Sequence, residues 1–311
     1  MTAGSSNTSS ASSRAILVTG ASGFVGERLI HRLENRGVPA IGTYLSHSIR
    51  PRQTRMIPID LIDAAAVRRL FEEARPRAVI HAAALTNVAI CEQQPELARR
   101  AIVEATANLV AECKQSSIPI AMLSTDLVFD GKHAPYREGD ETNPLSTYAK
   151  LKLEAERVTL ASPKGAVLRA ALIYGRPGTY AGSCLGWMLD TLRNGKELVL
   201  FEDEFRTPIY VDDLCVALEA FAEFPLTGLW HAGGPEVLNR VAMGEAVARV
   251  FRLSQSLLVA RKLANSTYAA PRPPNTSLVS DRLWRQVAHV PRPFEKALRE
   301  IAAELSADTA T

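Results

Sequence analysis

The chain has 311 residues, of which 47% are hydrophobic and 22% charged, as is ordinary for a globular protein of one or two domains. Its formal net charge of +3 is too small to favour nucleic acid or an anionic membrane surface as a partner. No apolar run reaches the roughly 18 residues that a membrane-spanning helix needs, so we expect no membrane contact.

The N-terminal residues and the cysteines bear on the cellular compartment. Residues 1–13 are rich in Ser and Thr and lack apolar periodicity, so we predict a disordered tail that is not a secretory signal. The four cysteines are far apart and form no C-x-x-C pair, which indicates reduced thiols in a reducing compartment. We therefore expect a cytoplasmic protein.

A glycine-rich loop follows the first predicted strand. Residues 15–19 form a short apolar run typical of a parallel sheet, and the sequence GASGFVG comes directly after it. A helical apolar pattern then continues until Gly37, a residue type that commonly ends helices. Strand, glycine loop and helix in this order are the setting of a dinucleotide-binding fingerprint, with the pyrophosphate on the helix N-terminus. The cofactor-binding residues predicted in this loop are Gly20, Ser22, Gly23, Phe24, Val25 and Gly26.

The end of the second predicted strand, 38–44, indicates which cofactor is bound. An acidic residue there binds the ribose 2′-hydroxyl of NAD, whereas a nearby arginine suits the 2′-phosphate of NADP. The strand ends at Tyr44 without a carboxylate, and the residues that follow are polar or basic. We predict that NADP is preferred and that Tyr44, Ser46 and Arg50 contact its ribose; the alternative is a basic surface loop.

The third predicted strand, 56–63, ends in an acidic pair. Asp60 could accept a hydrogen bond from the adenine amino group, and Asp63 could cap the helix predicted over 64–74. Both interpretations can hold, because they use different residues.

Further strands and helices complete a repeated pattern. A fourth strand at 78–84 ends in small residues that would let a flat ligand lie close, and we interpret its His81 as a packed residue. A long helix at 96–115 and a strand from 118 to 123 follow. Five or six strand–helix units in a row predict an α/β fold, a Rossmann-type doubly wound parallel sheet.

The stretch 123–156 carries the residues best suited to catalysis. It begins as a buried strand that ends at Thr125, crosses a loop and enters a helix that opens near Ser146. Tyr148 and Lys152 are four residues apart, so they lie on one helix face, which is also the spacing of many solvated faces. The lysine would lower the pKa of the phenol and make Tyr148 a proton donor and acceptor for a carbonyl/alcohol pair. Thr125 could polarise the same oxygen.

The character of the chain changes after about residue 165. We predict a dinucleotide-binding domain over 14–165, and a mainly substrate-binding lobe over 166–311 with elements that return to the Rossmann sheet. An irregular, proline-rich loop at 272–278 belongs to this lobe.

Taken together, these segments resemble the extended short-chain dehydrogenase/reductase superfamily and, within it, dTDP-4-dehydrorhamnose reductases. The resemblance covers roughly residues 15 to 300. The motifs that carry it are TGASGFVG (19–26), HAAALTNV (81–88), STDLVFDG (124–131), TYAKLK (147–152), LIYG (172–175), RTPIYVDDL (206–214) and RPPNTSL (272–278).

The resemblance implies an NAD(P)H-dependent reductase of a nucleotide-linked 4-keto-6-deoxysugar, with Thr125, Tyr148 and Lys152 as the catalytic residues. It implies further that the adenine and the nicotinamide side of the cofactor contact Asp60, Leu61, Ala82, Ala83, Ala84, Tyr148 and Lys152. The substrate-binding residues expected on this basis are Thr86, Val128, Arg206 and Arg272, with the two arginines on the diphosphate.

Two departures from the family pattern keep other functions open. Ile102 stands where members usually carry an asparagine that supports a water relay, and the acidic cluster that binds a metal in some reductases is not recognisable, so we expect no metal. The same branch contains the regulatory β subunit of methionine adenosyltransferase, which keeps the nucleotide site but acts by docking on another enzyme. A non-catalytic NADP-binding subunit, or a nucleotide-sugar epimerase or dehydratase, is therefore the alternative. A homodimer is possible.

Overall fold

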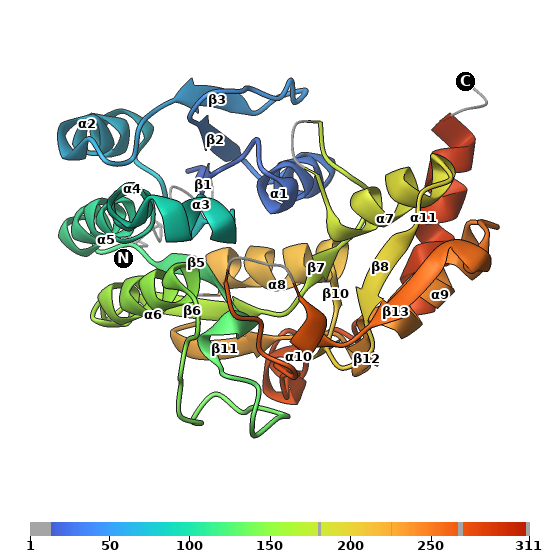
Figure 1. The fold of residues 1–311 in the computed structure, drawn as a ribbon. Helices are drawn as coiled ribbons and strands as arrows, with labels where there is room; N and C mark the ends of the chain where they lie inside the picture. The colour runs from blue at the N-terminus through green and yellow to red at the C-terminus, as the bar shows by residue number, and fades with distance from the viewer. Residues whose placement is uncertain (1–13, 180–181, 225, 267–269, 309–311) are drawn as a thin grey trace, which may run out of the picture.

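The computed structural model describes residues 14–179, 182–224, 226–266 and 270–308 (Figure 1). The tail predicted over residues 1–13 lies outside the described residues. Among the helices in these ranges, none has both the length and the apolar character needed to cross a membrane.

A seven-stranded parallel sheet forms the centre of the larger part of the molecule, in the order β11-β6-β5-β4-β1-β2-β3. The order reverses between β1 and β4, and in such sheets ligands bind at this switch point, outside the carboxyl ends of the strands. The fold class predicted from the sequence is thus confirmed. The strands are β1 (Ile16–Thr19), β2 (Ala40–Tyr44), β3 (Arg55–Pro58), β4 (Ala78–His81), β5 (Ile120–Thr125), β6 (Gly165–Ala170) and β11 (Gly228–Ala232).

Helices cover both faces of this sheet, because its strands are apolar on both sides. Ile16 and Val18 of β1 pack in one core with α1 (Phe24–Asn35) and α8 (Val211–Glu223). Leu17 points the other way, into a core shared with two helices of the opposite face. The helices of this second face are α2 (Ala64–Ala74), α5 (Ala105–Gln115) and α6 (Thr147–Leu160).

Helix boundaries predicted from capping residues are confirmed. Asp63 accepts hydrogen bonds from the backbone N–H groups of Ala65 and Ala66 at the start of α2. Ser146 accepts one from Ala149 at the start of α6, which places the beginning of the Tyr148 helix.

The helix predicted over 96–115 is one continuous element with a π-helical turn in its middle. α4 (Pro95–Arg99) passes into a π-helix (Arg100–Glu104), which passes into α5. A shorter helix, α3 (Val88–Gln93), precedes it. Turns of this kind frequently occur at functional sites, and this one brings Ala101 to the pocket described below.

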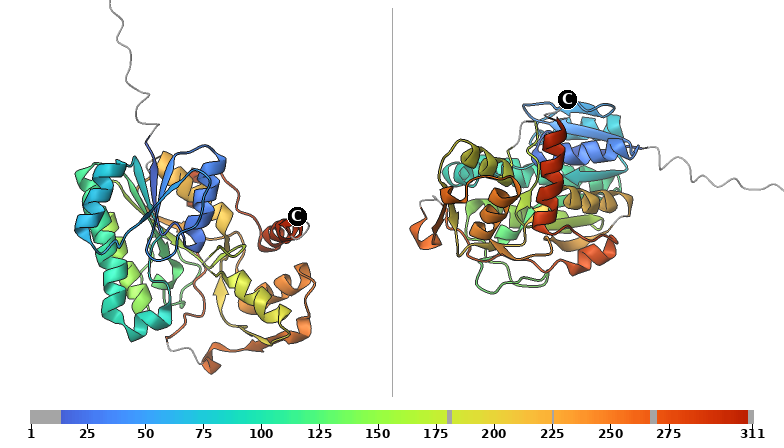
Figure 2. Two further views of the ribbon diagram at one scale, coloured as in Figure 1. Left: turned by 90° about the horizontal axis from the view of Figure 1, so that it is seen from above. Right: turned by 90° about the vertical axis from the view of Figure 1, so that its right-hand side faces the viewer.

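The rest of the chain forms a smaller lobe beside the sheet (Figures 1 and 2). Two strands from this part of the chain, β6 and β11, belong to the main sheet. Its small sheets pair β7 (Ile173–Tyr174) with β10 (Ile209–Tyr210), β8 (Leu198–Phe201) with β13 (Leu258–Arg261), and β9 (Phe205–Arg206) with β12 (Leu238–Asn239). Its helices are α7 (Cys184–Arg193), α9 (Arg240–Val250), α10 (Asp281–Gln286) and α11 (Phe294–Asp308).

Candidate active site

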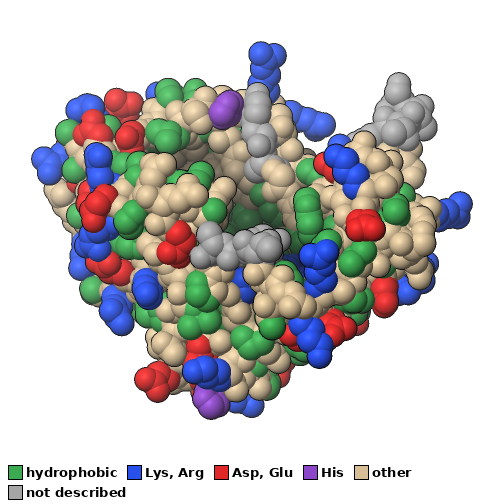
Figure 3. Space-filling view, viewed as in Figure 1, with side chains coloured by type: hydrophobic (Ala, Val, Ile, Leu, Met, Phe, Trp, Pro, Cys, Tyr) green, Lys and Arg blue, Asp and Glu red, His purple; other side chains and the backbone are tan. Residues whose placement is uncertain are grey.

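A pocket of about 1110 Å³ runs along the carboxyl ends of the parallel strands and under the smaller lobe. In Figure 3 it is the hollow in the middle of the face shown. Its lining combines the glycine loop after β1, the ends of β2, β4 and β5, one face of α6 and several residues of the lobe.

The glycine loop has the close packing that a dinucleotide needs. Gly20 has a φ of +66°, and a Cβ there would lie 2.7 Å from the Cα of Ala83. At Gly26 a Cβ would lie 2.1 Å from the carbonyl oxygen of Gly20, so only glycine lets α1 approach this loop. No side chain at these glycines covers the backbone at the N-terminus of the 12-residue helix α1. Such a helix end favours the binding of a pyrophosphate. The residues present therefore fit a dinucleotide.

His81, at the end of β4, contacts Thr19, the residue that precedes the glycine loop. Its ring lies between Thr19 Oγ1 at 2.7 Å and Thr106 Oγ1 at 3.0 Å. Thr106 donates its only hydroxyl proton to the carbonyl of Ile102, so His81 donates from Nε2 and accepts at Nδ1. Burial, with a smaller effect of Lys152, lowers the pKa of His81 to about 3, which keeps the ring neutral. His81 is a packed residue, as predicted.

The end of β2 differs in part from the prediction. Tyr44 and Ser46 line the pocket, but Arg50 does not, and its side chain is exposed. The loop after Arg50 is instead turned toward α1, because the carboxylate of Glu34 accepts hydrogen bonds from the N–H groups of residues 52–54. The sequence could not show this anchor, which sits at the far end of the preceding helix.

The other predicted cofactor contacts line the pocket. Asp60 and Leu61 lie beside the end of β2, and Asn108 Nδ2 donates to the Leu61 carbonyl at 2.9 Å. The Asp60 carboxylate accepts from the N–H of Ile62 at 3.0 Å. The small residues Ala82, Ala83 and Ala84 follow β4 and line the pocket, and Ala83 lies next to Gly20 of the glycine loop.

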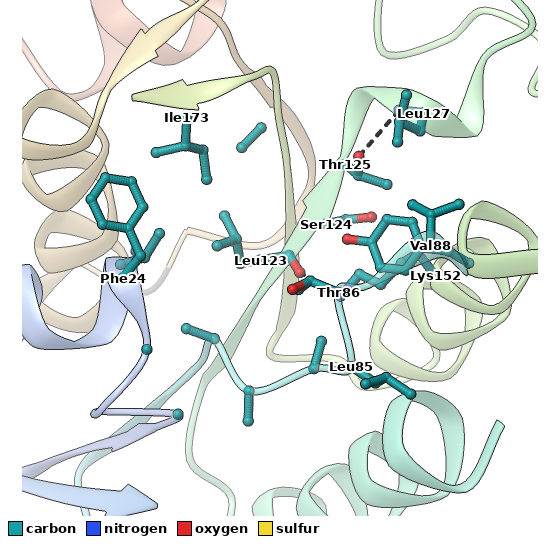
Figure 4. Close-up of a pocket in the computed structure, with 18 of the residues that line it drawn as sticks. Phe24, Leu85, Thr86, Val88, Leu123, Ser124, Thr125, Leu127, Lys152 and Ile173 are labelled. Carbon is teal, nitrogen blue, oxygen red and sulfur yellow. Dashed lines mark hydrogen bonds between the residues drawn. The ribbon is translucent and has the colours of Figure 1, made fainter. Parts of the chain in front are cut away.

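Thr125, Tyr148 and Lys152 come together at the end of β5, and all three line the pocket. Figure 4 shows the Thr125 and Lys152 side chains on one wall, with Phe24 and Ile173 on the side of α1. The Lys152 ammonium donates to the carbonyl oxygen of Leu123 at 2.7 Å. The three residues are almost fully buried, so charge that develops near them is poorly screened.

The expected effect of Lys152 on Tyr148 is corrected by this geometry. Burial raises the pKa of the Tyr148 phenol, Asp126 and Cys91 raise it further, and only the hydrogen bond with Thr125 lowers it. Burial also lowers the pKa of Lys152 to about 8, against the opposing effect of Glu156. The phenol is therefore a protonated donor at neutral pH.

Behind Thr125 lies a charged cluster, made of Asp126, Glu204, Arg206, Arg240, Arg272 and Thr276. Glu204 is fully buried and pairs with Arg206 at 3.0 Å, Arg240 at 3.3 Å and Arg272 at 2.8 Å. Burial alone would raise its pKa, but the three arginines together lower it to about 2. Asp126 links the cluster to Thr125, since its carboxylate accepts a hydrogen bond from Thr125 at 3.3 Å and one from Thr276 at 2.6 Å.

Among the predicted substrate residues, Thr86, Arg206 and Arg272 line the pocket and Val128 does not. The prediction for Val128 is wrong, because the short 3-10 turn after β5 directs its side chain into a core with Phe129 and Tyr136. Sequence reasoning missed Asp126 and Arg240, which line the pocket. Asp126 could have been noticed beside Thr125, whereas nothing local marks Arg240.

Ile102, at the position of the usual family asparagine, lies in the π-helical turn. Its side chain is buried in a cluster with Met122, Tyr148 and Leu151. Its carbonyl oxygen accepts the proton of Thr106 at 2.5 Å. An apolar side chain thus packs beside the phenol where a polar amide was expected.

The model of the family described as "RmlD substrate binding domain" matches residues 14–307, and the chain belongs to this family. It is 33% identical over 295 residues to methionine adenosyltransferase 2 subunit beta of Xenopus tropicalis, covering 92% of this chain and 86% of that protein. It is 30% identical over 267 residues to the "Probable low-salt glycan biosynthesis reductase Agl14" of Haloferax volcanii, covering 84% and 88%.

Solved structures agree with this placement. A dTDP-4-dehydrorhamnose reductase of Clostridium acetobutylicum superposes with a TM-score of 0.80 at 26% identity, over 94% of this chain and 99% of that one. The same fold occurs in a reductase of Bacillus anthracis in complex with NADP, with a TM-score of 0.80 at 20% identity over 94% and 99%. It also occurs in MoeE5 in complex with UDP-glucuronic acid and NAD, with a TM-score of 0.81 at 22% identity over 95% and 99%.

Proposed function

We propose that this protein is a reductase that uses NADPH to reduce a nucleotide-linked 4-keto-6-deoxysugar. One observation carries the proposal: Thr125, Tyr148 and Lys152 share a pocket with both a dinucleotide-type glycine loop and the charged cluster. Membership of the RmlD family supports it, as does the similarity to reductases of nucleotide-linked sugars.

The chemistry follows from the position of each group. NADPH, when bound, would supply the hydride for the ketone carbon. Tyr148 would give its phenolic proton to the oxygen that becomes the alcohol, since it is protonated at neutral pH. Thr125 would orient the carbonyl through its hydroxyl, and the Lys152 ammonium would stabilise the phenolate that forms.

The charged cluster is suited to the diphosphate of such a substrate. Its three arginines face two carboxylates, Glu204 and Asp126, which leaves one positive charge in surplus. Arg272 is the most exposed of the three, with 28% of its side chain accessible. Guanidinium groups bind phosphate oxygens in pairs, so a diphosphate would be held beyond the reacting carbon.

The preference for NADPH rests on the end of β2. Tyr44 and Ser46 line the pocket there, and neither carries a charge that would repel a 2′-phosphate. The related structures contain NADP in one case and NAD in the other.

A dehydratase is less well supported by the lining. Eliminating water from a sugar requires an acid and a base in addition to the tyrosine. Among the described lining residues the carboxylates are Asp60, at the adenine end, and Asp126. Asp126 already accepts hydrogen bonds from Thr125 and Thr276 and pairs with Arg206.

A second candidate is a non-catalytic subunit of another enzyme. The 33% identity to a methionine adenosyltransferase subunit favours it, and so does Ile102 in place of the polar relay residue. This candidate predicts NADPH binding without turnover of any ketosugar.

The test is NADPH oxidation against a panel of nucleotide-linked 4-ketosugars, with Tyr148→Phe as the variant. We expect turnover to fall by about 10²- to 10⁴-fold, because a positioned acid is removed, while cofactor affinity changes little. Tyr174→Phe is the matched control: Tyr174 is buried, its hydroxyl has no partner in the described structure, and it does not line the pocket. Unchanged turnover in Tyr148→Phe would contradict the catalytic assignment. If the wild-type protein binds NADPH but does not oxidise it in the presence of any ketosugar of the panel, the non-catalytic subunit is favoured.

A further inference from the structure

A polar seam joins the catalytic helix to the catalytic strand. Three residues of α6 at successive helical turns, Tyr148, Lys152 and Glu156, each contact one of the last three residues of β5. Thr125 lowers the pKa of the Tyr148 phenol, Lys152 Nζ donates to the Leu123 carbonyl at 2.7 Å, and Ser124 Oγ donates to Glu156 Oε1 at 2.5 Å. The first two contacts belong to the proposed catalytic residues, whereas Glu156 has no role so far.

Glu156 is held as a carboxylate from a second direction. Arg169 of β6 donates from Nε to both carboxylate oxygens at 3.1 Å and from Nη2 to Oε2 at 2.7 Å. Arg169 is also the register partner of Ser124 across β5 and β6. The Arg169 and Glu156 side chains are only 4% and 2% exposed, so a bidentate pair is fixed inside the protein.

A buried ion pair is expensive in desolvation and is often replaceable by apolar residues without loss of stability. Its retention one helical turn from Lys152 therefore suggests a task other than stability. Burial removes water from the Lys152 ammonium and so disfavours its charged form. The negative charge of Glu156, one helical turn away, favours the protonated form.

Other groups around Lys152 do not replace this charge. His81 faces it from β4 but is neutral, and Tyr148 on its own helix is a protonated phenol. Asp126 follows β5 but is engaged with Thr125, Thr276 and Arg206. Arg169, from β6, is the positive partner of Glu156 itself.

We propose that Glu156 is a positioning residue of the active site, which, held by Ser124 and Arg169, aligns Lys152 with Thr125 and keeps its ammonium protonated. The inference rests on the proposed function, because it assigns Glu156 a role in that same site. A merely structural ion pair would change thermal stability and lower activity equally at every pH. A positioning role moves the pH at which activity is lost.

The test compares kcat/KM between pH 6 and 10 in wild type and in the double variant Glu156→Gln, Arg169→Met. The double variant removes both charges, so no unpaired arginine stays buried and folding is protected. In wild type we expect activity to fall as the pH rises through the Lys152 pKa of about 8. In the double variant this fall should begin at a lower pH, by up to about one unit, because the Arg169 charge that opposes Glu156 is removed together with it. Activity near pH 6 should stay within a few-fold.

Two further variants separate the causes. Glu154→Gln, on the exposed side of the same helix in a pair with Arg99, should leave the pH profile unchanged. Glu156→Asp keeps the charge but shortens the side chain, so it should lower kcat with little shift of the profile. A folded double variant with the wild-type profile would overturn the proposal.

The affinity for NADPH over the same pH range gives a readout that needs no turnover. If Glu156 acts through Lys152, affinity should weaken above about pH 8 in wild type and at lower pH in the double variant. If the wild-type protein shows no turnover, the proposed reductase function is contradicted but the role of Glu156 is not. If wild type and the double variant show the same dependence of NADPH affinity on pH, the role of Glu156 is contradicted.

Discussion

The two ends of the pocket are built in different ways. The cofactor end, where we propose that the dinucleotide binds, is formed by one continuous segment, β1, the glycine loop and α1. Its shape is set by backbone that no Cβ can enter at Gly20 and Gly26. The substrate end, where we propose that the diphosphate of the substrate binds, is formed by charged side chains from separate segments, which meet around the fully buried Glu204. One end depends on steric fit, and the other depends on balanced charge.

Because of this difference, a substitution that damages one end of the pocket should leave the other end intact. A methyl group is enough to damage the backbone site, whereas loss of one charge is enough to damage the cluster. Substitutions at one end should leave the ligand of the other end bound.

The largest effect is expected from Glu204→Gln. It leaves Arg206 and Arg240, both nearly buried, without their shared carboxylate, and breaking a buried pair in this way costs about 3–5 kcal/mol. Urea unfolding should show this loss, and the KM for the substrate should rise, while NADPH affinity measured on the folded fraction stays near wild type. Glu202→Gln is the control, because that side chain is 46% exposed. A loss of NADPH affinity as large as the loss of substrate affinity would break the comparison.

A smaller effect is expected from Gly26→Ala. The new Cβ would lie 2.1 Å from the Gly20 carbonyl oxygen, and crowding of this kind costs about 1–3 kcal/mol. Calorimetric titration should show NADPH binding weakened about 5- to 150-fold, the same energy expressed as affinity. Gly139→Ala should bind NADPH normally, since a Cβ there meets nothing within 4 Å. Normal binding by Gly26→Ala would show that α1 can shift away from the loop.

The smallest effect is expected from Arg50→Ala. Titration with both cofactors should show NADPH bound more tightly than NADH, because neither Tyr44 nor Ser46 carries a charge that would repel the 2′-phosphate. Because Arg50 is exposed and does not line the pocket, its removal should change the ratio of the two affinities by less than about 1 kcal/mol. A complete loss of the preference would show that the 45–54 loop moves to the phosphate.

The cofactor end could be predicted from the sequence because its signals are local. Gly20 to Gly26 are contiguous, and Asp63 and Ser146 cap helices that begin at the next residue. The proximity of Tyr148 and Lys152 was predictable for the same reason, since the two residues share one helix.

The substrate end could be predicted only in part because its contacts are distant in sequence. Asp126 and Thr276 are 150 residues apart, and Arg206 and Thr276 are 70 apart. Nothing local tells which basic residue of the lobe turns inward, so Arg240 was missed. The pKa of Tyr148 was mispredicted because spacing on a helix says nothing of burial, which raises the pKa of the phenol.

The sheet order also has a consequence for how the chain folds during synthesis. β5, which ends at Thr125, has an open edge until β6 is made, and β6 in turn waits for β11 at Gly228–Ala232. At about 5–20 residues per second, the ribosome leaves these edges unpaired for several seconds. Exposed edges of this kind recruit other strands, so a fragment that stops at residue 165 should aggregate. The two parts therefore cannot be separated at their sequence boundary, because β5 gains its neighbour in the sheet only from the part that follows it.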